Sequence, residues 1–467
     1  MSAIENMSDE EYYQDYDQLP DNQIELLAEF ERRRRARTIH VSTDDNEVKI
    51  NLRKLHEPIC LFGEGPAERR ERLKSLVSRL TDDEIARKLK KKEEQEKREE
   101  ESQNEVTWYH EGSDLMLYGR FWIAEYSLKR AKERVALQKA QSQMPEIDKT
   151  ARVQESYRYL RNFANYSSQI GDIRPLSFCR FSPNSKMVAV ASWSGLCKLW
   201  SVPDCKLVRT LAAHTANASS IIFHPESTLS LDPKSVNMVS TAFDGSVKLW
   251  NMEDDKPIGE LDGMEPSRVS KAEFHPSGRF LACVCHDNSW RLWDVERVEE
   301  ILHQEGHSRP VMDISFQCDG SICCTGGQDS FGRVWDLRTG RCIMLMEGHL
   351  KSILSIDCNS NGYQIATGSE DNTAKIWDLR QSKCIYTIPA HNNLISKVKF
   401  QKGEGNYLIT ASYDYTLKAW AHPGWTPIKE LKGHEQKIMG CDVSEDNKWI
   451  VSCAYDKTFK LWSHENF

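Results

Sequence analysis

The stretch GHLKSILSIDCNSNGYQIATGSEDNTAKIWD, residues 348–378, decides the architecture of this 467-residue chain, because weaker or stronger copies of it occur seven times. A tryptophan closes each copy, and successive tryptophans are 50, 43, 42, 42, 43 and 42 residues apart. An aspartate stands six residues before the tryptophan in six copies, and Ser194 replaces it in the first. A histidine precedes the tryptophan by 28 or 29 residues in four copies and by 36 in a fifth. The repeated residues are Trp200, Trp250, Trp293, Trp335, Trp377, Trp420 and Trp462, then Asp244, Asp287, Asp329, Asp371, Asp414 and Asp456, and finally His214, His307, His349, His391 and His434.

A period of about 40 to 45 residues, with Gly-His near the start and Trp-Asp at the end, is the signature of a WD40 propeller blade. Each copy contains four short strand patterns, which in the quoted copy and its continuation are 353–358, 364–369, 373–378 and 384–388. A four-stranded sheet with two apolar faces and open edges is satisfied only in a closed ring. We therefore predict an all-β, seven-bladed WD40 β-propeller over residues 163–467.

The end of the chain leaves the seventh copy short of a strand. Only five residues follow Trp462, too few for a fourth strand in the last blade. We predict that residues 163–169, immediately before the first strand of the first blade, supply it and close the ring.

The recurrence of His, Asp and Ser or Thr in each copy resembles a catalytic triad, but we interpret it as structural. An enzyme needs one site with one nucleophile, whereas this set occurs several times. Inside a blade, Asp accepts turn amides, His donates to Asp, and the Trp N–H needs an acceptor. We expect no enzymatic activity, no cofactor, no metal and no small-molecule substrate. The first and third blades, which lack the Asp or the Gly-His, are expected to be the least rigid.

The region before the repeats has a different composition. Among the first 160 residues 63 are charged, against 69 of the remaining 307. Such a charged segment does not build one compact core, so we predict an α-helical, charged and partly disordered region. Its expected parts are an acidic disordered tail (1–20), a helix with an arginine cluster (21–46), a motif (47–80), a charged helix or linker (81–106) and a helical segment (107–162).

Bulk properties exclude several classes of protein. The net charge of −8 argues against a surface that coats nucleic acid throughout, so any such contact must be local. No apolar run approaches 18 residues, and the acidic N-terminus lacks the apolar core of a signal peptide, so no membrane partner is expected. Thirteen of the 14 cysteines lie in the repeats at apolar positions, which indicates reduced, buried thiols in an intracellular protein.

An arginine cluster follows an apolar helix pattern that starts near Asp21. Its members are Arg32, Arg33, Arg34, Arg35 and Arg37. A cationic helix end complements the helix dipole, but five arginines in six residues exceed that need. A nuclear-import signal or a phosphate contact are equally weighted alternatives.

Residues 47–80 predict two short helices around a small apolar turn. Val48, Leu52 and Leu55 form one apolar face ending before Pro58, and Pro66 suits the first position of the second helix. Apolar residues of the turn cannot be well buried in so small a unit, which favours docking on another chain; the docking residues are Pro58, Ile59, Leu61 and Phe62. Basic residues of the second helix are either surface charge paired with Glu68 and Glu71 or a nucleic-acid contact, namely Arg69, Arg70, Arg72 and Arg79.

Two further features concern the propeller. Residues 107–162 carry enough apolar side chains to fold against the propeller or a partner, with helices expected from near Ser127 and over about 148–160. The residue before each blade aspartate is often aromatic, as in Trp193 and Tyr413, and either packs between blades or forms a rim for a partner.

Leu52-Arg53, Glu57 to Glu64 and Ala67 to Leu73 together resemble the splicing-factor motif of a small set of pre-mRNA splicing proteins. With the segment 108–112 and the propeller, nearly the whole chain is similar to the family of WD-repeat subunits of the U4/U6 small nuclear ribonucleoprotein (snRNP). The resemblance implies a nuclear, non-enzymatic scaffold of the U4/U6 snRNP and the U4/U6·U5 tri-snRNP in splicing. The implied partners are a companion U4/U6 snRNP protein, a nuclear cyclophilin, other tri-snRNP proteins and the U4/U6 small nuclear RNA.

An alternative is a WD40 substrate receptor of a cullin-type ubiquitin ligase. The sequences Trp335-Asp336-Leu337-Arg338 and Trp377-Asp378-Leu379-Arg380 match the Trp-Asp-x-Arg pattern of such receptors. Trp-Asp ends many blades and a following arginine is common by chance, so the pattern discriminates poorly.

Overall fold

The computed structural model describes residues 41–55, 57–61, 63–79 and 114–464 apart from 262, 265 and 266, together with Glu29 and Arg34. The chain divides into two compact units, Met1–Thr107 and Trp108–Phe467. The predicted tail at 1–20, most of the predicted helix after Asp21 and the predicted charged helix at 81–106 lie outside the described residues.

The described part of the first unit is a pair of helices. Helix α3 spans Asp45–Lys54 and is capped by the Asp44 carboxylate, which accepts from the Asn46 amide at 3.1 Å. Helix α4 spans Pro66–Arg79, so its predicted start at Pro66 is confirmed. Val48, Leu52 and Leu55 of the first helix pack on Leu73 of the second, and all four are buried.

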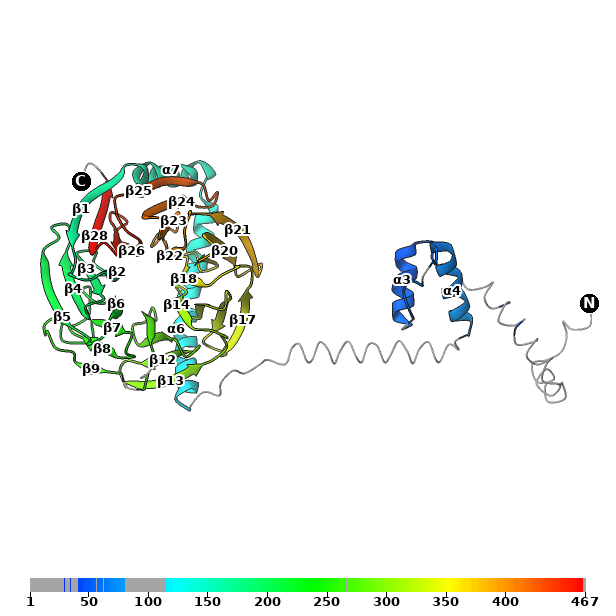
Figure 1. The fold of residues 1–467 in the computed structure, drawn as a ribbon, viewed down its shortest axis with the longest axis horizontal. Helices are drawn as coiled ribbons and strands as arrows, with labels where there is room; N and C mark the ends of the chain where they lie inside the picture. Colours follow the sequence, from blue (N-terminus) through cyan, green and yellow to red (C-terminus); the bar gives the residue numbers. More distant parts are fainter. Residues whose placement is uncertain are drawn as a thin grey trace, which may run out of the picture. The chain divides into compact units, whose positions relative to one another are not determined.

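The second unit is a ring of seven four-stranded antiparallel sheets, which confirms the predicted propeller (Figure 1). Neighbouring sheets meet through their innermost strands, and the ring closes where β2 meets β26. Six sheets are built from consecutive strands, which are β2 (Leu176–Phe181), β3 (Met187–Ser192), β4 (Leu196–Ser201) and β5 (Leu207–Ala212); β6 (Ala218–Phe223), β7 (Met238–Ala242), β8 (Val247–Trp250) and β9 (Gly259–Glu260); β10 (Val269–Phe274), β11 (Phe280–Cys285), β12 (Trp290–Asp294) and β13 (Glu299–Gln304); β14 (Val311–Phe316), β15 (Ile322–Gly327), β16 (Gly332–Asp336) and β17 (Arg341–Met346); β18 (Ile353–Cys358), β19 (Gln364–Ser369), β20 (Thr373–Asp378) and β21 (Lys383–Pro389); β22 (Ile395–Phe400), β23 (Tyr407–Ser412), β24 (Thr416–Ala421) and β25 (Pro427–Lys432).

The seventh sheet joins the two ends of the propeller. Its order is β1-β28-β27-β26, with β26 (Ile438–Val443), β27 (Ile450–Ala454) and β28 (Thr458–His464) supplied by the end of the chain. Strand β1 (Phe163–Ile170) runs antiparallel to β28, from Phe163 opposite His464 to Ile170 opposite Thr458, with a shift of register between Asn165 and Ser167. The predicted closure by residues 163–169 is therefore confirmed.

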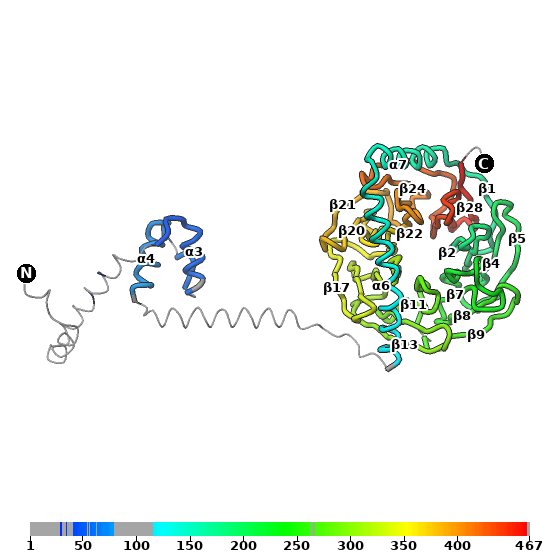
Figure 2. Tube along the Cα trace, turned by 180° about the vertical axis from the view of Figure 1, so that it is seen from behind, coloured from blue at the N-terminus to red at the C-terminus, as the bar shows by residue number. Residues whose placement is uncertain are grey.

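Two helices precede β1 and lie against the disc (Figure 2). Helix α7 spans Glu146–Arg161, and helix α6 spans Asp114–Gln143 without interruption. The expected start of a helix near Ser127 is therefore wrong. Met116 and Ile123, spaced seven residues apart on one helix face, are buried against the third and fourth sheets, so packing on the propeller extends the helix toward its N-terminus.

The disc has two distinct faces, because strands alternate in direction. Turns between the first and second strands of each sheet lie on the face that α6 covers, where Arg134 binds Asp319 at 2.7 Å and Gln138 binds the Asn361 carbonyl at 2.7 Å. Turns between second and third strands lie on the opposite face. We call these the α6 face and the His–Asp face.

Charged side chains of the innermost strands pair across the central channel. Lys397 of β22 reaches Asp313 of β14 at 2.7 Å, passing over the intervening sheet, and Lys271 of β10 approaches the same carboxylate at 3.2 Å. Lys399 binds Asp357 at 2.6 Å. Burial lowers the pKa of Lys271 to about 8, although Asp313 favours its charged form.

Candidate functional site

The turn between α3 and α4 is the best-defined part of the predicted motif. Glu64 organises it, because its carboxylate accepts from the Leu61 amide at 3.0 Å and from Arg72 at 2.6 Å. Arg72 also donates to the Pro58 carbonyl at 2.9 Å. One arginine and one glutamate thus connect α4 to the backbone of Pro58 and Leu61 in the turn.

The basic residues of α4 have different environments. Arg69 is only 6% exposed and donates to Asp45 of α3 at 2.5 Å, so its charge is used inside the unit. The expected pairing of these arginines with Glu68 and Glu71 is wrong for Arg69 and Arg72, whose partners are Asp45 and Glu64. The reason is tertiary packing, because α3 packs on α4 and brings Asp45 next to Arg69, 24 positions further along the chain. Arg70 is exposed and donates to the Val41 carbonyl at 2.7 Å, and the side chain of Arg79 lies outside the described residues.

Apolar residues of the turn lie on the surface of this unit. Leu61 is 49% exposed, Pro58 is exposed and Ile59 is half-buried, while Phe62 lies outside the described residues. The turn therefore presents apolar surface on a backbone that Arg72 and Glu64 connect to α4. In the arginine cluster, Arg34 is exposed and helical; Arg32, Arg33, Arg35 and Arg37 lie outside the described residues.

The fifth blade shows the hydrogen-bond network of the repeat in full. His349 Nδ1 donates to Asp371 at 2.7 Å, and its Nε2 lies 2.8 Å from the hydroxyl of Thr367. The same hydroxyl oxygen accepts from the Trp377 indole N–H at 2.9 Å. Burial alone would raise the pKa of Asp371, but the hydrogen bonds from His349 and Thr373 outweigh it and hold that pKa well below its usual range.

Three other blades repeat this arrangement with His–Asp distances of 2.8–2.9 Å. Their sets are His307, Asp329, Thr325 and Trp335; His391, Asp414, Thr410 and Trp420; and His434, Asp456, Ser452 and Trp462. All four hydroxyl-bearing side chains are 0% exposed. A buried hydroxyl whose oxygen already accepts from an indole cannot receive a substrate, so the triad-like geometry serves the fold.

The first three blades depart from this arrangement. In the second, Ser246 stands between His214 and Asp244: its hydroxyl donates to Asp244 at 2.6 Å, and its oxygen lies 2.6 Å from His214 Nδ1, from which it accepts. In the first, Asp172 replaces the missing aspartate and binds Ser194 and Lys198. The repeat pattern did not predict this role, because Asp172 stands 22 residues before Ser194.

In the first and third blades, the blade tryptophan lacks the hydroxyl group that accepts its indole N–H in other blades. The acceptor position ten residues before the tryptophan is Val190 in the first blade and Cys283 in the third. Within the described residues, the indole N–H groups of Trp200 and Trp293 are buried without a hydrogen-bond partner. The lower rigidity expected of these two blades stays a prediction, now with a residue-level cause.

The residues that precede the blade aspartates form a ring around one mouth of the channel. Each donates its backbone N–H, at 2.8–3.1 Å, to a carbonyl immediately before the innermost strand of its own blade. The donors, which we call the mouth ring, are Trp193, Phe243, His286, Gln328, Glu370, Tyr413 and Tyr455, and the acceptors are Pro175, Asn217, Arg268, Pro310, Ser352, Leu394 and Lys437. Seven equivalent bonds place all seven side chains on the His–Asp face.

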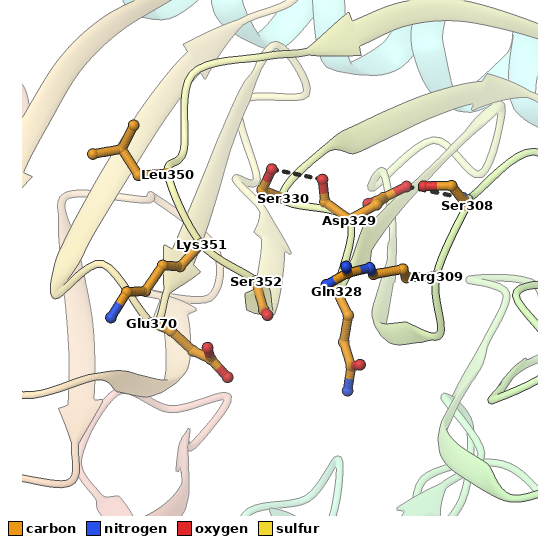
Figure 3. A pocket seen from close by; sticks show the side chains of 9 residues that line it. All are labelled: Ser308, Arg309, Gln328, Asp329, Ser330, Leu350, Lys351, Ser352 and Glu370. Atoms are coloured by element: carbon orange, nitrogen blue, oxygen red, sulfur yellow. Dashed lines mark hydrogen bonds between the residues drawn. The ribbon is translucent and has the colours of Figure 1, made fainter.

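A pocket opens on this face between the fourth and fifth blades, with a volume of about 490 Å³ (Figure 3). Arg309 and Gln328 line one side of it and Lys351 and Glu370 the other. Leu350 beside it is 89% exposed.

Two classes of site are not found in the described part of the chain. No three His, Cys, Asp or Glu side chains gather there to bind a metal. None of the helices described is both long and apolar enough to cross a membrane. The described cysteines are free thiols, and burial raises the pKa of Cys283 well above its usual value.

Two family models match this chain. The one described as "pre-mRNA processing factor 4 (PRP4) like" matches residues 48–76, which include most of α3, the turn and most of α4. The one described as "WD domain, G-beta repeat" matches seven stretches, namely 164–201, 205–251, 255–294, 299–336, 340–378, 382–421 and 425–463. The stretch 164–201 contains β1 to β4, so a sequence repeat combines the outer strand of one sheet with three strands of the next.

Several curated proteins are similar to this chain. A mouse protein and a human protein, each named U4/U6 small nuclear ribonucleoprotein Prp4, are 56% identical over 237 and 229 residues. These matches cover 51% and 49% of this chain but only 45% and 44% of the relatives. The budding yeast U4/U6 small nuclear ribonucleoprotein PRP4 is 34% identical over 421 residues, 88% of each chain.

Proposed function

This chain belongs to the Prp4 family of U4/U6 small nuclear ribonucleoprotein subunits, and from that premise we propose that it acts in the nucleus as a non-catalytic scaffold subunit in pre-mRNA splicing. The observation that supports this most strongly is the combination, in one chain, of the PRP4-like motif and a closed seven-bladed propeller. A propeller alone would indicate only an interaction platform.

The scaffold role is supported by the chemistry of the repeats. The hydroxyl groups that resemble nucleophiles are buried and already accept hydrogen bonds from tryptophans. What remains accessible are loops on two faces of a rigid disc, and such loops usually carry the specificity of a propeller.

The motif unit is proposed to dock on protein and RNA. Pro58, Ile59 and Leu61 form an apolar turn for a protein partner, with Phe62 as its fourth member. The exposed Arg34 and Arg70, with the rest of the arginine cluster and Arg79, suit phosphate contacts, whereas Arg69 and Arg72 keep the turn in shape. The proposed partners are a companion U4/U6 snRNP protein on the propeller, U4/U6 small nuclear RNA, other tri-snRNP proteins and a nuclear cyclophilin.

The test is affinity purification of the full chain with sequencing of the bound RNA. We expect the parent chain to recover U4 and U6 RNAs with one companion protein, and the double change Leu61→Ala and Phe62→Ala to reduce that recovery at least about tenfold, because an apolar anchor of an interface is lost. Leu229→Ala, at a 66% exposed leucine of the second blade, is the matched control. An unchanged set of partners in the double variant would contradict the proposed docking role of the turn.

The same purification discriminates the cullin-receptor alternative. Arg338 and Arg380 bind Asp336 and Asp378 of their own Trp-Asp pairs at 3.0 and 2.8 Å. Arg380 remains 61% exposed and lies over Tyr363. Recovery of a cullin adaptor without U4 and U6 RNAs would favour that alternative and contradict the splicing role.

A further inference from the structure

Five cations lie at the mouth ring, next to the backbone groups that define it. Arg268 and Lys437 are themselves acceptors of the ring hydrogen bonds, and Arg174, Arg309 and Lys351 directly precede acceptors. Glu370 is the one carboxylate among the seven ring residues. The blade aspartates lie on the same face, but those of the fourth to seventh blades are only 3–14% exposed and are bound to histidines. The five cations therefore contribute much of the accessible charge around the mouth.

These cations differ from those inside the channel. Lys271, Lys397 and Lys399 are each bound to a buried aspartate. By contrast, within the described residues none of the five mouth cations takes part in an ion pair, and Arg174, Arg268, Arg309 and Lys351 are exposed. Unpaired cations gathered around one opening focus the field there and attract an anionic ligand.

Aromatic side chains alternate with these cations. Lys437 Nζ lies 5.0 Å from the ring centres of both Tyr413 and Tyr455, and Trp193 meets Tyr455 edge-on at 5.4 Å. A cluster of three aromatic rings and one cation therefore spans the sixth, seventh and first blades. All three rings are partly exposed.

On the other side of the mouth, a pocket lies between the fourth and fifth blades. Arg309 and Lys351 flank the pocket of about 490 Å³, and Gln328 adds an amide that both donates and accepts (Figure 3). Two carboxylates also line it: Asp329, which is already bound to His307, and Glu370, on the same side as Lys351. This volume lies within the range of roughly 300–1,000 Å³ in which small ligand-sized groups bind. The pocket is large enough for a base or a nucleotide.

We propose that the mouth ring on the His–Asp face binds a single-stranded segment of RNA, with bases stacked on Trp193, Tyr413 and Tyr455 and phosphates at the five cations. Cations that follow a backbone together with aromatic faces that accept any base are the combination that single-stranded nucleic acids require. An acidic peptide would use the cations but not the stacking surfaces. The choice of RNA rests on the proposed function, whereas the site itself rests on the geometry.

The experiment uses the full chain and a 12-nucleotide oligouridylate that contains 4-thiouridine, read out by fluorescence anisotropy and by mass spectrometry of photo-crosslinked peptides. Crosslinks are expected in the loops that carry the mouth ring. The double change Arg309→Gln and Lys351→Gln is expected to weaken binding about tenfold and to reduce the salt dependence, because about two phosphate contacts are lost. Tyr413→Leu with Tyr455→Leu is expected to weaken binding with an unchanged salt slope, and its melting temperature checks the fold.

The matched control is Lys129→Gln with Lys132→Gln, two exposed charges of α6 on the opposite face. Crosslinks confined to residues 1–107, equal affinity in all variants, or binding of an oligoglutamate peptide but not of the RNA would each overturn the proposal. Those results leave the co-purification of U4 and U6 RNAs unaffected, so failure of the mouth-ring site is distinguishable from failure of the splicing role.

Discussion

At the residue scale, one hydroxyl joins the polar groups of a blade. In the fifth blade Thr367 is 0% exposed and contacts both His349 and Trp377. Removing it leaves an imidazole nitrogen and an indole N–H without partners in a dry interior, which costs more than the hydrogen bonds themselves contribute.

We therefore expect Thr367→Val to lower the free energy of unfolding by about 1–3 kcal/mol, despite its similar shape. Urea unfolding followed by tryptophan fluorescence measures the change. Thr387→Val, on the exposed strand β21, serves as the control and should change stability by less than about 0.5 kcal/mol. Equal effects of the two changes would contradict the role given to Thr367.

His275 is a second buried residue, and its burial affects how the stability of the fold depends on pH. It is 0% exposed beneath α6, its Nε2–H donates to the Gly320 carbonyl at 2.8 Å, and its Nδ1 accepts from the Ser277 amide at 3.2 Å. These partners suit the neutral ring, and burial lowers the pKa of His275 to about 4.

The consequence is a loss of stability in mild acid. Between about pH 6.5 and pH 4 the unfolded chain binds a proton that the folded chain does not, so the free energy of unfolding falls as pH falls, by on the order of 3 kcal/mol at the lower limit. His275→Gln is expected to make this decline shallower in urea titrations at several pH values. A parent chain equally stable at pH 6.5 and pH 4 would contradict the expectation.

At the element scale, β1 closes the ring from the other end of the sequence. It binds β28 along its whole length, and Phe163 at its start is 1% exposed between Tyr159 and the last two sheets. Strand β1 thereby covers the outer edge of β28 and completes the four strands of the seventh sheet. The fold of the seventh blade therefore depends on a segment that precedes the first blade in the sequence.

Truncating the anchor of β1 tests this dependence. We expect Phe163→Ala to cost about 3–5 kcal/mol, the range for a buried aromatic side chain. Ile170→Ala, at a 69% exposed residue of the same strand, is expected to cost little. Thermal unfolding compares the two; similar melting temperatures would show that β1 does not anchor the ring.

At the scale of the whole molecule, buried ion pairs connect blades that are not neighbours. Asp313 is 2% exposed and binds Lys271 of the third blade and Lys397 of the sixth. Burial alone would raise the pKa of Asp313, but the two lysines outweigh it and keep the carboxylate ionised. Removing one member of such a group leaves uncompensated buried charge.

Asp313→Asn is accordingly expected to lower the free energy of unfolding by about 3–5 kcal/mol near pH 7. Since the pKa of Lys271 is about 8, the loss should diminish above that pH, where this lysine becomes neutral. Urea unfolding at pH 7 and pH 9 measures both effects, with Glu430→Gln at the exposed pair with Lys432 as the control. An equal loss in the free energy of unfolding at pH 7 and pH 9 would contradict the role of Lys271.

Sequence patterns predicted the features that repeat and the features that are local. The seven tryptophans, the His–Asp positions and the strand at 163–169 follow from a period and from the need to close a ring, and the start of α4 at Pro66 follows from backbone geometry. The patterns missed Asp172 in the first blade, the continuous helix from Asp114, and the use of Arg69 inside the motif unit. In each case the deciding contact joins residues that no periodicity relates.

By itself, then, the sequence determined that this protein is a seven-bladed propeller with a motif unit before it, because periodicity and turn chemistry act over a few residues at a time. Only the tertiary structure decided which charged side chains are bound to a partner within the protein and which are exposed. Lys397 binds the buried Asp313 and the buried Arg69 binds Asp45, each from a distant segment, whereas Arg309 and Lys351 remain exposed at the mouth ring. Whether a charge stabilises the fold or remains available for a ligand depends on what lies within a few ångströms in space, and that distance is set by the packing of the blades.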